Sequence, residues 1–291
     1  MPAPLKLMVA TDFSERSDRA LRRATLIARE VDAVISLIHV VDEDQPRRII
    51  EAERNNALAI LHEQISTLRE IDGISATSRV VIGTVFGGIV QATREESPAA
   101  LIIGPHRRQA LRDLFMGTTA ERTIREVSCP VLMVNGPPVA PYRKCVMTTD
   151  CSDGSRRALE ITDSLGIAPR AISSLLLVFD APVLRLAMSY TLSEHEKADY
   201  LEDERREAML HLSEFSEKLS IKQPHLIVRQ NKTTPAYEIL AAAEELSADL
   251  IVVGTRRASG FTRLILGSVA EEVLRRAHCD VLAVPPGSAH G

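Results

Sequence analysis

The chain has 291 residues, of which 45% are hydrophobic and 25% charged, and its formal net charge is −4. This composition is typical of a globular protein of two domains, and the weak negative charge without tryptophan argues against a nucleic-acid partner. No apolar run approaches the roughly 18 residues of a membrane-spanning helix, and the first residues lack a signal-peptide pattern, so we expect a cytoplasmic protein without a membrane partner.

The first half alternates strands and helices. An apolar run at 5–9 predicts the first strand, and a polar turn around Asp12 leads into a helix with Ser14 as its N-cap. Further strands are expected at 34–41, 77–82, 100–103 and 131–134, and helices at 49–71 and 89–96. A glycine-containing loop at 83–88 is expected before the last of these helices.

The second half repeats this order after a stiff, proline-rich linker at 137–141, which separates a domain at 1–136 from a domain at 142–291. Strands are expected at 142–148, 172–179, 226–230, 250–253 and 281–284, and helices at 158–165, 200–219, 236–246 and 269–277. The second half also carries a longer connection, with an extra turn or loop around 186–195.

A glycine-centred stretch occurs in both halves and identifies an internal duplication. The equivalent pairs, at one constant separation, are Gly104 and Gly254, Gly117 and Gly267, Thr118 and Ser268, and Cys129 and Cys279. The alternation of strands and helices in each half predicts an α/β fold of two tandem, doubly wound, parallel five-stranded sheets.

Ligands of such sheets bind outside the carboxyl ends of the strands, where the strand order reverses. Three features of each half meet there: the turn with Asp12 or Asp150, the end of the second strand at Val40 or Val178, and the glycine loop. A glycine that opens a helix leaves N–H groups free for phosphate, so the set indicates a mononucleotide site.

The same residues also have purely structural interpretations. The aspartates and hydroxyls can serve as helix caps, the arginines of the loops can be exposed charges, and the loop glycines can merely shape turns. His39, on an apolar strand, is more readily explained as a buried, hydrogen-bonded histidine than as a ligand.

At these residues the chain resembles the universal stress protein family in its tandem form. The resemblance rests on TDFSERSDRAL at 11–21, IHVVD at 38–42 and the two glycine loops, and it covers 4–136 and 142–286. It implies two Rossmann-like domains of the adenine-nucleotide alpha-hydrolase type, packed as a pseudo-twofold pair. One class of members binds ATP through a G-x2-G-x9-G-[ST] loop, and another class lacks the loop and binds no nucleotide.

By this pattern the expected cofactor is ATP, accompanied by Mg²⁺. The aspartates would contact the ribose–adenine region, the two valines would contact adenine through their backbone, and the loops would hold phosphates. The candidate site residues are Asp12, Val40, Gly104, Arg107, Gly117, Thr118 and Thr119 in the first half and Asp150, Val178, Gly254, Arg257, Gly267, Ser268 and Val269 in the second.

The chain departs from the family loop at the middle glycine, which is Arg107 in one half and Arg257 in the other. If this position needs a positive φ, the loop changes shape and no nucleotide binds; if it needs only its N–H, arginine can add a charged contact to phosphate. Pro105 restricts Gly104 and lacks an N–H donor, which favours the second half as the nucleotide site.

The sequence therefore predicts a stress-response protein that binds ATP or a related adenine nucleotide without efficient turnover. The alternatives are an interaction scaffold without nucleotide and, third, a weak ATPase; no Walker lysine or metal-binding cluster supports an enzyme. The final strands, 131–134 and 281–284, are expected to pair with each other within the chain. A homodimer of the whole chain stays an open alternative.

Overall fold

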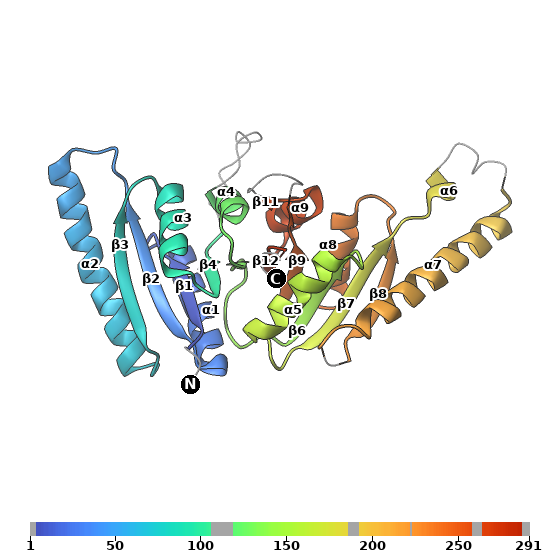
Figure 1. Cartoon of the computed structure of the whole chain (residues 1–291), viewed down its shortest axis with the longest axis horizontal. Coiled ribbons are helices and arrows are strands. Elements are labelled where there is room, and N and C mark those ends of the chain that lie inside the picture. Colours follow the sequence, from blue (N-terminus) through green and yellow to red (C-terminus); the bar gives the residue numbers. More distant parts are fainter. Residues whose placement is uncertain (1–3, 106–118, 186–191, 222, 258–263, 287–291) are drawn as a thin grey trace.

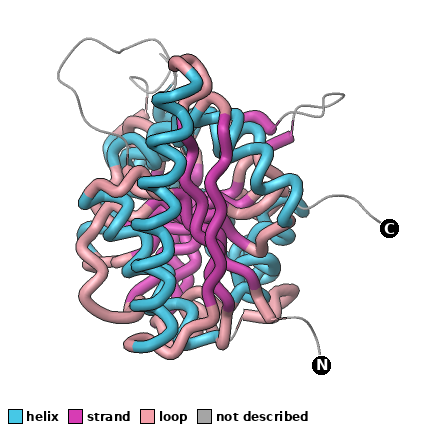
Figure 2. Tube along the Cα trace, turned by 90° about the vertical axis from the view of Figure 1, so that its left-hand side faces the viewer, coloured by secondary structure: helices cyan, strands magenta, loops and turns pink. Residues whose placement is uncertain are grey.

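The computed structural model describes residues 4–105, 119–185, 192–221, 223–257 and 264–286 (Figure 1). A central sheet runs through the whole molecule. Figure 2 views the end formed by the first half and shows the strands enclosed between helices on both sides. None of the described helices is long and apolar enough to cross a membrane.

The first half contains nine elements in the described residues. They are β1 (Lys6–Ala10), α1 (Glu15–Val31), β2 (Val34–Val41), α2 (Arg47–Glu70), β3 (Ala76–Ile82), α3 (Val85–Glu96), β4 (Ala100–Ile103), α4 (Thr119–Glu126) and β5 (Val131–Met133).

The second half follows the same order with additions. Its elements are β6 (Lys144–Thr149), α5 (Asp153–Leu165), β7 (Ile172–Phe179), α6 (Pro182–Arg185), α7 (Glu194–Ser216), β8 (His225–Gln230), α8 (Pro235–Glu245), β9 (Leu250–Gly254), β10 (Arg256–Arg257), β11 (Leu264–Ile265), α9 (Ser268–Arg276) and β12 (Asp280–Val284). The predicted alternation of strands and helices in both halves is confirmed.

The two halves share one ten-stranded sheet with the order β3-β2-β1-β4-β5-β12-β9-β6-β7-β8. Neighbouring strands within each half are parallel, whereas β5 and β12 are antiparallel, with Leu132 opposite Leu282. Both leucines are fully buried. Strands covered by helices on both faces must be apolar on both faces, which explains their continuous hydrophobic runs.

Each face of the sheet carries a hydrophobic core that contains residues of both halves. The core on one face includes buried residues of α1, α2, α5 and α7, and the core on the other face includes those of α3, α4, α8 and α9. In Figure 1, α4 and α9 lie next to each other above the central strands, and a 2.9 Å ion pair between Arg125 and Glu271 joins them. Packing therefore continues across the boundary between the repeats.

A buried network around Asp280 ties the linker to both halves. The Asp280 carboxylate accepts hydrogen bonds from Arg23 Nε of α1 at 2.9 Å, from the Tyr142 hydroxyl at 2.6 Å, and from the backbone N–H groups of Asn135 and Gly136 at 2.9 and 3.0 Å. The guanidinium of Arg23 also lies 4.1 Å from the centre of the Tyr142 ring. Burial, together with the neighbouring carboxylate, raises the pKa of Tyr142 well above its usual value of 10.

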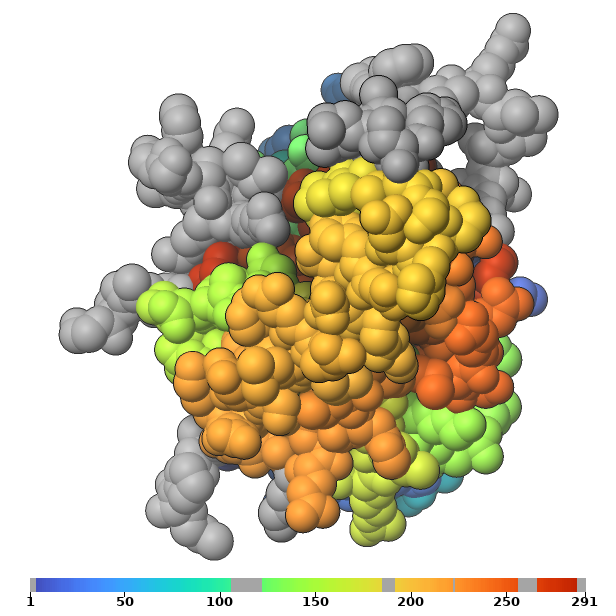
Figure 3. Space-filling model, turned by 90° about the vertical axis from the view of Figure 1, so that its right-hand side faces the viewer, coloured from blue at the N-terminus to red at the C-terminus, as the bar shows by residue number. Residues whose placement is uncertain are grey.

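The long helix of the second half begins earlier than predicted, at Glu194 instead of Tyr200. Ser193 Oγ accepts a hydrogen bond from the N–H of Glu196 at 3.2 Å, and the Glu196 carboxylate accepts one from the N–H of Ser193 at 2.8 Å. This capping box starts the helix before its apolar periodicity becomes visible. The gold atoms of α7 lie across this end of the molecule (Figure 3).

Replacing Ser193 with Ala is expected to lower the free energy of unfolding by about 1 kcal/mol, because it removes the capping oxygen. Urea unfolding followed by circular dichroism measures this change. Ser213→Ala, near the end of the same helix, is the control and should change the free energy by less than about 0.5 kcal/mol. Equal effects of the two substitutions would contradict the role of the cap.

The predicted loop at 83–88 is wrong beyond Thr84, because Gly87 and Gly88 lie in the first turn of α3. Thr84 Oγ1 accepts a hydrogen bond from the N–H of Gly87 at 3.2 Å and so caps the helix. A Cβ atom on Gly88 would come within 2.7 Å of Val40 Cγ1, so this glycine permits close packing of α3 on β2. These two glycines therefore shape a helix.

The glycine loop of the second half contains a short β-hairpin that the sequence did not indicate. Arg256 pairs with Ile265 and Arg257 with Leu264 in antiparallel strands β10 and β11. Arg257 is not among the described residues with a positive φ, so arginine fits the backbone here without strain.

Candidate functional site

A cavity of about 400 Å³ opens at the carboxyl edge of the first half. It lies where the strand order reverses between β1 and β4, the expected place for a ligand in a doubly wound sheet. Its lining residues are Ala10, Thr11, Asp12, Arg16, Ser17, Ile38, His39, Val40, Val85, Ile89, Ile103, Gly104, Pro105 and Thr123. The cavity thus brings together three of the predicted site residues: Asp12, Val40 and Gly104.

The turn that carries Asp12 is held by its own side chains. Asp12 Oδ1 accepts a hydrogen bond from the N–H of Ser14 at 3.1 Å, and Thr11 Oγ1 accepts one from the N–H of Phe13 at 3.0 Å. Phe13 has a φ of 59°, which is uncommon for a residue with a side chain and is compatible with a strained functional turn. The turn therefore fixes the position of the Asp12 carboxylate.

Two opposing effects act on the Asp12 carboxyl. Partial burial alone would raise its pKa, but the hydrogen bonds from Ser14 and Ser17 and the charge of Arg16 outweigh burial and lower the pKa below 3.8. The carboxylate is therefore charged at neutral pH, able to accept hydrogen bonds but unable to donate them.

The second half repeats this turn at Asp150. Asp150 Oδ1 accepts a hydrogen bond from the N–H of Ser152 at 3.1 Å, Thr149 Oγ1 accepts one from the N–H of Cys151 at 2.9 Å, and Cys151 has a φ of 57°. The two aspartates thus hold the turn before each helix through the N–H of the N-cap residues Ser14 and Ser152, and neither aspartate is itself the cap that the structural interpretation expects. The second carboxylate oxygen of Asp12, Oδ2, faces the side chain of Arg16, which also lines the cavity.

The backbone N–H and C=O of Val40 face the crevice beyond the end of β1. The pairing of β1 with β2 ends at Ala10 and Ile38, with a last hydrogen bond from the N–H of Thr11 to the Ile38 oxygen. Successive residues of a strand direct their backbone groups alternately to its two neighbours, and the Val41 oxygen accepts from Gly83 on the β3 side. Val40 therefore directs its N–H and C=O to the same side as Ile38, at the crevice.

The two equivalent glycines after β4 and β9 have different surroundings. A Cβ atom on Gly104 would lie 2.8 Å from the backbone oxygen of Arg16, so close packing of α1 requires glycine there. A Cβ atom on Gly254 would lie 3.7 Å from the Cβ of Ala158, an ordinary contact. Neither glycine has a positive φ. Gly104 thus has a packing role that the sequence did not reveal.

The other predicted residues of the first half lie at or beyond the limit of the described chain. Arg107, Gly117 and Thr118 are outside the described residues, and Thr119 is the first residue of α4. Their contacts with phosphate remain predictions.

In the second half, Gly267 is the N-cap of α9, and Ser268 and Val269 are its first residues. No atom of the described residues lies within 4 Å of a Cβ atom built on Gly267. Val178 belongs to β7, and its register with Arg229 of β8 corresponds to that of Val40 with Val81. The phosphate role of this loop remains a prediction.

His39 has the hydrogen bond expected of a histidine on an apolar strand. Its Nδ1 lies 2.9 Å from the Thr11 oxygen, and its ring stacks on Phe13 with centroids 4.3 Å apart. Since a carbonyl oxygen only accepts, Nδ1 carries the hydrogen. His39 is half-buried and also lines the cavity, so it supports the turn from within the site.

Arg16 is a lining residue that the sequence analysis did not single out. Its Nη2 lies 3.7 Å from Asp12 Oδ2. The local spacing gives no clear signal, because Asp12 lies in the turn before α1, which begins at Glu15. The second half has Gly154 at the equivalent position, the second residue of α5.

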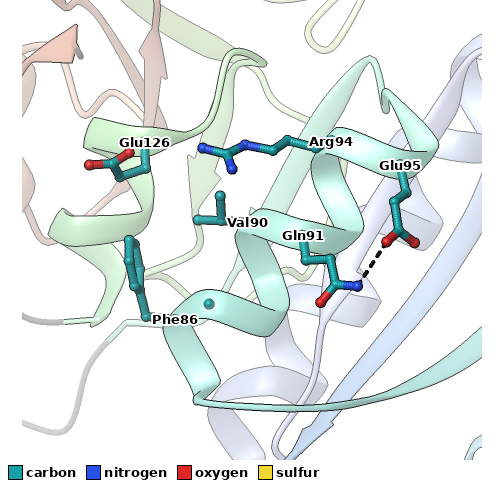
Figure 4. A pocket seen from close by; sticks show the side chains of 7 residues that line it. Phe86, Val90, Gln91, Arg94, Glu95 and Glu126 are labelled. Carbon is teal, nitrogen blue, oxygen red and sulfur yellow. Dashed lines mark hydrogen bonds between the residues drawn. The ribbon is translucent and has the colours of Figure 1, made fainter. Parts of the chain in front are cut away.

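A second cavity, of about 480 Å³, lies between α3 and α4, away from the strand ends (Figure 4). Arg94 of α3 extends above Val90 toward α4, which supplies Glu126, and Gln91 is hydrogen-bonded to Glu95 at 2.8 Å. None of the predicted nucleotide-binding residues lines it. The predicted site residues therefore favour the cavity at the sheet edge as the candidate site. In the described parts of the chain, no three His, Cys, Asp or Glu side chains are grouped to hold a metal ion.

Comparison with known proteins places these observations in a family. A protein of Mycolicibacterium smegmatis named as a universal stress protein is 25% identical over 96% of this chain and 97% of its own length. A universal stress protein of Methanocaldococcus jannaschii is 33% identical over 49% of this chain and 82% of its own length. The crystal structure of a universal stress protein from Archaeoglobus fulgidus matches 97% of this chain and 98% of its own with a TM-score of 0.69 at 20% identity.

The model of the universal stress protein family matches the chain twice, at residues 5–135 and 141–285. Together the two matches cover nearly the whole sequence and coincide with the two halves of the sheet. The chain therefore belongs to the universal stress protein family.

Proposed function

We propose that this chain is a stress-response protein that binds an adenine nucleotide, ATP or a close relative, in the cavity of the first half, without efficient turnover. The observation that carries the proposal is the cavity itself, which joins Asp12, Val40 and Gly104 at the reversal of strand order. It outweighs the argument from Pro105 that favoured the second half. Its volume of about 400 Å³ lies in the usual range for small-molecule sites.

The cavity offers a suitable place for the base. Ile38, Ile89 and Ile103 provide apolar surface. The backbone N–H and C=O of Val40 supply one donor and one acceptor, and the edge of adenine presents the matching acceptor and donor. Apolar walls with a few polar groups are typical of sites that hold and orient a flat ring.

The polar end of the cavity suits a ribose and phosphates. The charged Asp12 carboxylate accepts hydrogen bonds, which the ribose hydroxyls can donate, as acidic residues do in other doubly wound nucleotide sites. The guanidinium of Arg16 is complementary to phosphate oxygens. Mg²⁺, which binds oxygen ligands, would accompany the phosphates.

The proposal of slow turnover rests on Asp12, the one carboxylate among the described lining residues of the cavity. Asp12 is held by Ser14, and its lowered pKa makes it a weak base. His39 donates Nδ1–H to Thr11 and stacks on Phe13, so its ring is held by the turn. The chain would thus respond to the nucleotide that it holds and not consume it.

The scaffold alternative is favoured by one observation in the second half. The pairing of Arg257 with Leu264 ties part of the glycine loop into a hairpin, which differs from the open phosphate loop expected there. A chain whose glycine loops exclude phosphate in both halves would act only through contacts of its surface. We therefore assign the scaffold role only to the outcome in which neither half binds nucleotide.

The test is to denature the purified protein, identify released nucleotides by mass spectrometry, and titrate the wild type with ATP, ADP and GTP by calorimetry. We expect binding of an adenine nucleotide. Asp12→Ala should weaken it about tenfold or more, whereas Asp150→Ala, which removes the same turn contact in the other half, should leave the first site intact. Absence of binding at millimolar ATP, or loss only in Asp150→Ala, would contradict the proposal.

A further inference from the structure

We propose that Arg16 makes the first half selective for phosphorylated nucleosides and that the two halves are consequently unequal sites. The inference rests on the proposed function and names the residue that contacts the anionic part of the ligand. The apolar end of the cavity would thus bind the base of the nucleotide, and Arg16 would bind its charged phosphates.

The packing of α1 against β4 places Arg16 at the entrance to the glycine loop. Its backbone oxygen lies 2.8 Å from the position of a Cβ atom on Gly104, the last described glycine before the loop. The side chain turns from there along the cavity and contacts Asp12 at 3.7 Å. Arg16 therefore lies between Asp12, the carboxylate proposed to hold ribose, and Gly104, after which the predicted phosphate loop begins.

The guanidinium is available to a ligand. Its contact with Asp12 is long, and the side chains of Arg16 and Asp12 are 35% and 64% exposed. An ion pair of this kind contributes little to stability, so exchanging it for a phosphate is favourable when the new contact is shorter and better enclosed. Asp12 does not depend on Arg16 for its position, because Ser14 holds it.

The charge balance of the cavity supports this assignment. Asp12 places a negative charge where phosphates would approach, and two negative groups at close range repel each other. Among the described residues that line the cavity, Arg16 provides the one guanidinium or ammonium group. Without it, the cavity would favour an uncharged nucleoside over its phosphates.

The second half offers a matched comparison. It repeats the Asp12 turn at Asp150 but carries Gly154 where α1 carries Arg16. A Cβ atom on Gly154 would lie 3.6 Å from Ser152 Oγ, an ordinary contact, and Gly154 has no positive φ. Arginine can therefore be introduced there without displacing the backbone.

The experiment exchanges these two residues and measures binding by calorimetry with ATP and with adenosine at low and at high salt. In Arg16→Gly we expect ATP affinity to fall about tenfold, adenosine affinity to change less than about twofold, and the salt dependence of ATP binding to weaken. Arg16→Lys should recover part of the loss. Gly154→Arg should raise the ATP affinity of the second half, detected as added binding at high ATP.

Each outcome bears on one of the two proposals. A wild type that binds neither ATP nor adenosine overturns the proposed function itself. A wild type that binds both, but whose Arg16→Gly variant loses the two ligands equally or keeps ATP unchanged, overturns the role of Arg16 alone. Thermal unfolding of each variant without ligand checks that the fold is retained.

Discussion

Replacing Asp280 with Asn is expected to lower the free energy of unfolding by about 3–5 kcal/mol, the usual consequence of removing one partner from a buried ion pair. The substitution keeps the shape of the side chain but removes its charge. Arg23 then remains charged in a site where it is 4% exposed. The amide also offers one acceptor oxygen in place of two, so either Arg23 Nε and the Tyr142 hydroxyl or the N–H groups of Asn135 and Gly136 lose their acceptor.

Urea unfolding of the full chain measures this effect. Asp153→Asn removes an equal charge from an exposed pair with Arg156 and should change the free energy by less than about 1 kcal/mol. Size-exclusion chromatography with light scattering adds a second readout, because a loosened junction allows β12 to pair with β5 of another chain. A stability change as small as that of Asp153→Asn would show that the network is not essential to the junction.

Gly104→Ala is expected to destabilise the protein by about 1–3 kcal/mol and to weaken nucleotide binding. The added methyl group would lie 2.8 Å from the backbone oxygen of Arg16, and a backbone atom cannot move aside as a flexible side chain can. Either α1 or the end of β4 must shift. The same shift displaces Arg16 relative to the cavity, so stability and ATP affinity should fall together.

Gly254→Ala is the matched control for this prediction. Its methyl group would meet only the Cβ of Ala158 at 3.7 Å, so we expect a change in the free energy of unfolding of less than about 0.5 kcal/mol. Denaturant unfolding and ATP titration of the two variants give the comparison. Equal effects at the two positions would mean that the close approach of α1 to β4 does not require glycine at position 104.

The strands and most helices could be predicted from the sequence because their signals are local. Buried parallel strands are apolar throughout, and the helices show apolar positions at helical spacing. The start of α7 was missed although its Ser193–Glu196 capping box is local, since the prediction followed apolar periodicity instead of caps. The hairpin of β10 and β11 has only two residues in each strand, too few for a recognisable pattern.

The candidate site was only partly predictable. Asp12 and Val40 could be found because the end of a strand and the turn after it follow from the strand pattern itself. The role of Arg16 depends on how closely α1 approaches β4, a distance set by packing and not by local sequence. The partnership of Arg23 with Asp280 joins residues 257 positions apart, and no spacing in the sequence indicates it.

The Asp280 network also illustrates how the two copies in a duplicated chain can come to differ. In a dimer of identical single-domain subunits, every substitution appears twice, once on each side of the symmetry axis. Here Asp280 occurs once, and Pro130 occupies the corresponding place in the first half. Within one chain the two copies can differ, so the second copy can carry the buried carboxylate of the junction while the first copy keeps a proline there.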